Sequence, residues 1–156
     1  MINNYTNDND EKINYYEFYR AKRYITTLNE LHFYKVLLEI AQELDLILFS
    51  QVSLYSIIEP KKNLNYSTWT KFFNKINRKS IDFVLVDKFT CKIKLCIELD
   101  DSTHKKYRRI KRDNFIDKLF QEVGVNLLRY PVYSVYYKET LKEKILQNMY
   151  EHYYTE

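Results

Sequence analysis

The sequence predicts an α/β domain in which a mixed β-sheet is flanked by helices. Several segments repeat apolar residues at helical spacing, and others are short apolar or alternating runs that are typical of strands. These segments follow one another in the order α-β-(α)-β-β-α-β-α. The strand, helix and strand at 93–100, 107–123 and 125–130 also predict a right-handed βαβ unit, in which the two strands are parallel.

The clearest helical pattern lies at 26–44, after a weaker amphipathic pattern that predicts a short helix at 13–25. The longer helix has one apolar stripe, formed by Phe33, Leu37, Ala41 and Leu44. Thr27 and Glu30 have the spacing of a capping box at its start. Glu30 also lies on the stripe that Phe33 continues, which would point it toward the sheet. The two roles can coexist.

A strand and a second short helix are predicted next. The run at 46–54 is rich in Leu, Ile and Val and is bounded by a loop around Pro60, as expected of a strand. Residues 67–76 have the pattern of a short helix, for which either Ser67 or Thr68 would be the N-cap.

Two strands at 80–87 and 92–100 are predicted to pair as neighbours. The second strand alternates without interruption, so its two faces differ. Its apolar face, which we expect to be core, consists of Ile93, Leu95, Ile97 and Leu99. Its other face, which we expect to be polar, consists of Lys92, Lys94, Cys96, Glu98 and Asp100.

A helix is predicted at 107–123, with Asp101 or Ser102 as its cap. Gly124 is the only glycine in the chain and follows this helix directly. A glycine in that place is typical of the left-handed residue that closes a helix. A strand at 125–131 should then end at Pro131.

The last helix is predicted at 138–153, with one apolar face formed by Leu141, Ile145 and Met149. At 156 residues the chain has the length of one domain. We expect a tail and short helix at 1–24, the main domain at 25–135, and a C-terminal helix at 136–156 that packs on that domain.

Composition favours a cytoplasmic protein that does not enter a membrane. The chain has no apolar run of the ~20 residues that span a bilayer, and its polar, acidic start lacks the features of a signal peptide. Cys91 and Cys96 would lie about 16 Å apart in an extended segment, too far for a disulfide. They form no C-x-x-C pair, so we expect free thiols and no structural zinc site.

Three acids surround the end of the second predicted hairpin strand. Asp82 and Glu98 lie symmetrically about residue 90, which is in the middle of the connection. That register places them opposite each other on one face, with β-carbons ~5 Å apart, and Asp100 is next on that face. Like charges this close repel, and a divalent cation such as Mg²⁺ removes the repulsion. The alternative is that these acids end strands at a solvated face of the sheet.

A basic cluster follows the acids. The segment "HKKYRRIKR" at 104–112 holds three of the seven arginines of the chain, whose net charge is +4. Such a patch is suited to phosphates. A solvated helix face is an equally good explanation of the cluster.

The segments "RKSIDFVLVD", "LCIELDDSTH" and "KRDNFIDKLFQEVGVNLLRYP" together resemble a bacterial domain-of-unknown-function family, 2726. That family is placed in the PD-(D/E)xK nuclease superfamily, near the very-short-patch-repair endonuclease group. The resemblance covers residues 25–131. It implies a restriction-endonuclease-like core with the order α-β-β-β-α-β.

The resemblance also implies a set of site residues. Asp82 and Glu98 would bind Mg²⁺ or Mn²⁺ together with the backbone carbonyl of Leu99, and Glu30 aligns with an acid that assists. The superfamily has lysine where this chain has Asp100, which becomes an alternative ligand or a support for the ligands. His104 is the natural substitute for activating water. This departure leaves open whether the chain is catalytically active.

The expected function is a metal-dependent endonuclease that cleaves or nicks nucleic acid, with DNA as the first choice of substrate. The expected nucleic-acid contacts are Lys105, Lys106, Arg108, Arg109, Arg112 and Gln51. Gln51 would reach the metal or the scissile phosphate, although an exposed strand face explains it equally well. Two alternatives remain: an inactive nuclease fold that only binds nucleic acid, and a protein-interaction module. The sequence does not fix the oligomeric state.

Overall fold

A computed structural model describes residues 15–100 and 107–150, with the side chains of all of these except residues 16 and 107–112. Helices and strands alternate along the described chain except at the consecutive strands β2 and β3, and two short 3₁₀ helices, η1 and η2, accompany them. The elements are η1 (Tyr15–Glu17), α1 (Leu28–Glu43), β1 (Leu46–Ser53), η2 (Leu54–Ser56), α2 (Tyr66–Ile76), β2 (Ser80–Asp87), β3 (Ile93–Asp100), α3 (Tyr107–Val123), β4 (Leu127–Pro131) and α4 (Lys138–Tyr150).

Within the described residues the strands form one mixed sheet in the order β1-β2-β3-β4. The pairs β1/β2 and β2/β3 are antiparallel, whereas β3/β4 is parallel. The chain therefore makes a meander of three strands and then crosses over through α3 to reach β4. The predicted mixed α/β architecture and the parallel strand–helix–strand unit are confirmed.

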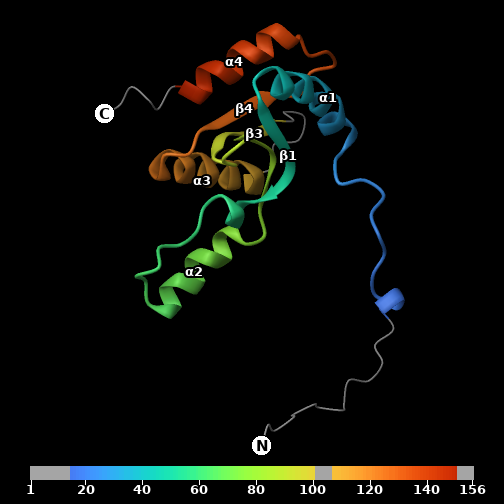
Figure 1. The fold of residues 1–156 in the computed structure, drawn as a ribbon. Helices are drawn as coiled ribbons and strands as arrows, with labels where there is room; N and C mark the ends of the chain where they lie inside the picture. The colour runs from blue at the N-terminus through green and yellow to red at the C-terminus, as the bar shows by residue number, and fades with distance from the viewer. Residues whose placement is uncertain (1–14, 101–106, 151–156) are drawn as a thin grey trace, which may run out of the picture.

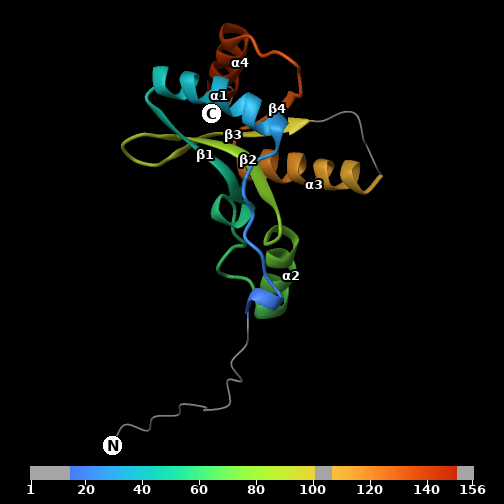
Figure 2. The same cartoon turned by 90° about the vertical axis from the view of Figure 1, so that its right-hand side faces the viewer.

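Helices cover both faces of the sheet (Figures 1 and 2). On one face, α1 and α4 lie side by side, and their apolar residues pack with Phe83, Leu85, Leu95 and Ile97 of the central strands. On the other face, Ile116 and Phe120 of α3 pack with Val84, Val86 and Cys96. Helix α2 projects away from the sheet at the end where β1 leaves it (Figure 1).

Local signals in the sequence account for the ends of two helices. Thr27 Oγ1 accepts a hydrogen bond from the Glu30 N–H at 3.3 Å, and Glu30 Oε2 accepts one from the Thr27 N–H at 2.6 Å, so the predicted capping box is present. Gly124 has φ +72° directly after α3, as predicted for a residue that closes a helix. The proposed caps Asp101 and Ser102 lie outside the described residues.

Two predicted elements differ from the structure. The helix predicted at 13–25 is reduced to η1 within the described residues, because its aromatic residues find no core: Tyr15, Phe18 and Tyr19 are each more than 60% exposed. Helix α2 is capped by Asn65, whose side chain accepts from the Thr68 N–H at 2.9 Å, and neither Ser67 nor Thr68 is the cap.

The second face of β3 also differs from its predicted polar character. Cys96 and Glu98 are buried, because α3 lies across this face and completes a second apolar cluster over it. Among the described residues, no helix is long and apolar enough to cross a lipid bilayer.

Candidate functional site

The observed pairing of β2 with β3 has the register from which the sequence predicted that Asp82 and Glu98 are opposed. Val84 lies opposite Cys96 and Phe83 lies opposite Ile97. Among the observed pairs, this register ends at Phe83 and Ile97, so Asp82 and Glu98 are the next residues beyond it, and their direct opposition stays a prediction.

Asp82 is held at the place where the β2–β3 ladder ends. Its Oδ2 accepts a hydrogen bond from the Leu99 N–H at 2.9 Å, and its Oδ1 accepts one from Gln51 Nε2 at 3.4 Å. The carboxylate of Asp82 therefore lies against the residue that follows Glu98.

The Leu99 carbonyl faces the same side as the Leu99 N–H. The Cys96 N–H donates to the Asn126 carbonyl at 2.9 Å, and the Val132 N–H donates to the Asp100 carbonyl at 3.1 Å, so the even residues of β3 bond toward β4. Backbone groups of successive residues in a strand point to opposite sides. Both backbone groups of Leu99 therefore point toward β2 and Asp82.

Glu98 is a buried acid, with 4% of its surface exposed, and no other charged side chain among the described residues is buried. Its charge is felt by its neighbours. Burial, and then the negative charge of Glu98, raise the pKa of the Cys96 thiol to about 12. Because burying a carboxylate is costly unless a positive charge or hydrogen bonds compensate it, Glu98 stands out from the solvated strand-end acids of the alternative interpretation.

Gln51 connects Asp82 to helix α1. Gln51 Nε2 donates to Glu30 Oε1 at 3.1 Å, and Ser80 Oγ donates to Gln51 Oε1 at 3.1 Å. Glu30 thus closes the capping box with one oxygen and faces the site with the other. Its two predicted roles coexist. The alternative that Gln51 is an isolated polar residue on an exposed strand face is wrong, because its side chain is hydrogen-bonded to Glu30 and Asp82 in part-buried contacts.

Asp100 is engaged by Arg129, the residue of β4 that is in register with Glu98. Arg129 Nη1 donates to Asp100 Oδ1 at 3.2 Å, and Arg129 Nε donates to Asp117 Oδ1 of α3 at 2.6 Å. Arg129 Nη2 also donates to the Asp113 carbonyl at 3.4 Å. The guanidinium joins β3, β4 and α3 beside the buried Glu98.

Charge and burial act in opposite directions on Arg129. Burial lowers the pKa of its guanidinium, but the hydrogen bond to Asp117 and the negative charges of Asp117, Asp100 and Glu98 outweigh burial, so the pKa is raised. Arg129 is not among the site residues that the sequence predicted. The signal that would have found it is the parallel register of β3 and β4, which the sequence does not give directly.

Several predicted site residues lie outside the described part of the chain. His104, Lys105 and Lys106 are among them, and Arg108, Arg109 and Arg112 are placed in α3 without a description of their side chains. Within the described residues, no group of three or more His, Cys, Asp or Glu side chains is arranged to hold a metal ion. The contact observed where the proposed ligands lie is that of the Asp82 carboxylate, near the start of β2, with the backbone N–H of Leu99, near the end of β3.

Comparison with known proteins identifies the family. A family model described as protein of unknown function (DUF2726) matches residues 22–149. The chain belongs to the DUF2726 family. No curated protein and no solved structure matches it.

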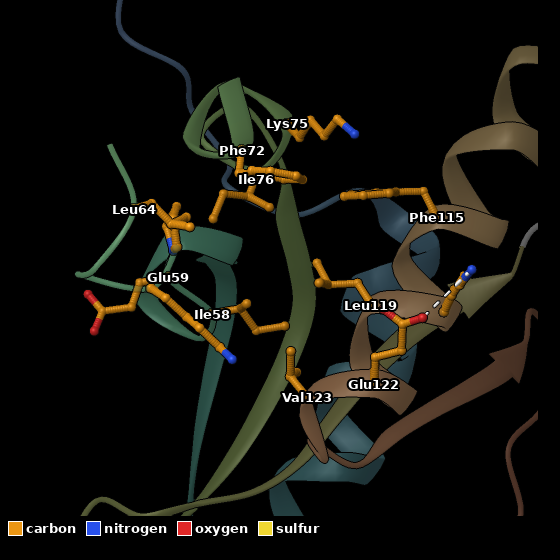
Figure 3. Close-up of a pocket in the computed structure, with 13 residues that line it drawn as sticks. Ile58, Glu59, Leu64, Phe72, Lys75, Ile76, Phe115, Leu119, Glu122 and Val123 are labelled. Carbon is orange, nitrogen blue, oxygen red and sulfur yellow. Dashed lines mark ion pairs between the residues drawn. The ribbon is translucent and has the colours of Figure 1, made fainter. Parts of the chain in front are cut away.

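This DUF2726 domain also has a cavity of about 480 Å³ between α2, α3 and the segment after η2 (Figure 3). Its walls are mainly apolar and include Phe72, Ile76, Phe115 and Leu119, while the Glu59 carboxylate points away from it. The acids of the candidate site, Glu30, Asp82, Glu98 and Asp100, do not line this cavity. It is separate from the residues around Asp82 and Glu98, and the charged residues of its lining are Glu59, Lys61, Lys75, Lys118 and Glu122.

Proposed function

We propose that this domain is a metal-dependent endonuclease that hydrolyses phosphodiester bonds in nucleic acid, with DNA as the preferred substrate. The observation that supports this most is the hydrogen bond from the Leu99 N–H to Asp82, beyond the last observed pair of β2 and β3 and next to the buried Glu98. It holds the Asp82 carboxylate against the residue that follows Glu98.

The donors at this place fit a hard divalent cation. Mg²⁺ takes oxygen ligands at about 2.1 Å and is often bound by one or two carboxylates, with water and substrate phosphate completing the shell. Asp82, Glu98 and the Leu99 carbonyl would supply such a set. A cation also compensates the negative charge of the buried Glu98, so the fit is electrostatic as well as chemical.

The fold is consistent with the PD-(D/E)xK superfamily. A helix, a meander of three strands, a crossover helix and a further parallel strand succeed one another as α1, β1-β2-β3, α3 and β4. The acids of the proposed site lie on β2 and β3, which are the central strands of this arrangement. The restriction-endonuclease-like core is part of the proposal.

In the proposed reaction, a bound Mg²⁺ or Mn²⁺ supplies a water of lowered pKa and stabilises negative charge on the phosphate. The residues of the chain hold and orient the reactants. Asp82 is fixed by the Leu99 N–H and by Gln51, so its position does not depend on the substrate. His104 would accept the proton of the attacking water, and the basic segment at 104–112 would bind backbone phosphates.

A plasmid-nicking assay tests the proposal. The wild-type domain should nick supercoiled DNA with Mg²⁺ or Mn²⁺ and not with EDTA. Glu98→Gln and Asp82→Asn should each abolish nicking. Asp87→Asn is the matched control and should retain activity. Asp87 is the last residue of β2, the strand that also carries Asp82, but it accepts hydrogen bonds from Thr90, away from the site.

The same assay, run beside a DNA-binding measurement, separates the rival functions. A domain that binds DNA in a salt-dependent way but never cuts it would be an inactive, nucleic-acid-binding fold. The observation that favours this alternative is that the position expected to hold a lysine holds Asp100, which is hydrogen-bonded to Arg129. A domain that neither binds DNA nor gains thermal stability from Mn²⁺ would be a protein-interaction module. Either result would overturn the endonuclease proposal.

A further inference from the structure

Gln51 has an unusual backbone for a residue inside a β-ladder. Its φ is +54°, in the left-handed region that residues other than glycine, asparagine and aspartate seldom adopt. The residues on either side pair normally with β2, since Ser50 lies opposite Phe83 and Val52 lies opposite Ile81. No residue is inserted at this point, so the strained conformation is not a bulge needed for register.

The left-handed residue coincides with a change of face in β1. Ile47 and Val52 are an odd number of positions apart, so regular alternation would place them on opposite faces of the sheet. Both pack in the cluster under α3. Ile81 and Val84 of β2 show the same change. The two strands turn together at the position of Gln51 and Asp82.

The turn places the Gln51 amide among residues from three elements. Its Nε2 donates to Glu30 of α1 and to Asp82 of β2, and its Oε1 accepts from Ser80 at the start of β2. Ionised carboxylates only accept hydrogen bonds, so the amide must turn its Nε2 toward Glu30 and Asp82, and its Oε1 is then left to accept from Ser80. Strained residues that persist at such places tend to serve a site, because relaxed alternatives are readily available.

We infer that Gln51 is a positioning residue, which holds the carboxylates of Glu30 and Asp82 at a fixed separation through its two amide N–H groups. Its left-handed backbone aims the amide, and the hydrogen bond from Ser80 anchors the amide oxygen. This role differs from that of a ligand to the metal or to phosphate. It rests on the proposed function only in that the carboxylate it orients, Asp82, is a proposed ligand.

The test is the affinity for Mn²⁺, measured by calorimetry on the full chain without nucleic acid. Gln51→Met keeps the length of the side chain and removes both donors. Loss of a residue that orients a metal ligand typically weakens binding by roughly 10- to 100-fold, and we expect a loss in that range. Ser80→Ala should weaken binding in the same direction but less, because the amide is retained and loses only one anchoring hydrogen bond.

A double mutant separates positioning from a general structural effect. If Ser80 acts through Gln51, then Ser80→Ala should change the affinity no further in the Gln51→Met background. Gln51→Gly provides a variant that folds even if Gln51→Met does not, because glycine adopts φ +54° without strain. It should weaken Mn²⁺ binding as much as Gln51→Met does. Cys91→Gly is the matched control, since Cys91 has φ +56° outside the site and should leave the affinity unchanged.

The outcomes distinguish this inference from the proposed function. Wild-type affinity retained by both Gln51 variants, with Asp82→Asn unable to bind, overturns the positioning role and leaves the metal site standing. Independent, additive losses from Ser80→Ala and Gln51→Met also contradict it. A wild-type chain that does not bind Mn²⁺ overturns both proposals.

Discussion

Replacing Arg129 with methionine should cost about 2–3 kcal/mol of unfolding free energy. The substitution keeps most of the apolar stem and removes the guanidinium. The Arg129 side chain has 19% of its surface exposed, and its guanidinium contacts Asp100, Asp113 and Asp117. Its loss also leaves these acids near Glu98 with no guanidinium among them, which adds repulsion between like charges.

The magnitude follows from the separate contacts. The partners Asp100 and Asp117 are 40% and 48% exposed, so each ion pair is assigned the solvent-screened value of about 0.5–1 kcal/mol. The hydrogen bond to the Asp113 carbonyl contributes about 1 kcal/mol. Their sum corresponds to a fall in melting temperature of about 5–10 °C for a domain of this size.

Urea denaturation in EDTA provides the measurement, because EDTA removes any contribution of bound metal. Arg129→Lys should recover less than half of the loss, since one ammonium cannot reach three partners that the fork of a guanidinium reaches. Lys88→Met is the control, as it removes an exposed ion pair with Asp45 and should change stability little. A loss of less than about 0.5 kcal/mol in Arg129→Met would refute the reasoning, because solvent would then have screened the whole network.

Two further predictions concern the titratable groups Glu43 and Cys96. Hydrogen bonds from Lys138 and then Lys142 lower the pKa of Glu43 from 4.5 to about 2. A carboxyl whose pKa is lower in the folded state stabilises the protein above its unfolded pKa. The difference in melting temperature between wild type and Glu43→Gln should therefore be present above pH 4.5 and disappear as the pH falls toward 2. The second prediction is that iodoacetamide at about pH 8 modifies the exposed Cys91 and leaves Cys96 intact, because burial and Glu98 raise the Cys96 pKa to about 12. Mass spectrometry of the native protein should show one adduct, and labelling of Cys96 would contradict the burial of the β3 face beside Glu98.

The parts of the fold that the sequence predicted are those set by local pattern. The apolar stripe of α1, the capping box of Thr27 and Glu30, and the left-handed Gly124 each depend on residues a few positions apart. The register of β2 and β3 was also predictable, because the connection in a hairpin relates the two strands by a simple symmetry, and it is observed at the pairs Leu85–Leu95, Val84–Cys96 and Phe83–Ile97. The opposition of Asp82 and Glu98 stays a prediction from that register.

The parts that the sequence did not predict depend on packing between distant elements. Amphipathic spacing suggested a helix at 13–25, but Tyr15, Phe18 and Tyr19 are exposed in the part of the chain that the structure describes, so the helix has no tertiary support there. The same spacing rules labelled Cys96 and Glu98 as a polar face, since the position of α3 over that face cannot be read from β3 alone. The left-handed Gln51 and the contacts of Arg129 likewise arise only once three or more elements have met.

Arg129 changes how the departure from the superfamily motif should be interpreted. An acid, Asp100, stands where a lysine is expected, which suggests a site without its positive charge. The structure brings a guanidinium to that place from the neighbouring strand, in register with Glu98 and hydrogen-bonded to Asp100. Asp117 and Asp113 also hold this guanidinium, so it compensates acids and is poorly placed to activate water. The presence of Asp100 in place of a lysine is therefore no argument against metal binding. In the proposed mechanism, a residue outside β3 and β4 would have to activate the water.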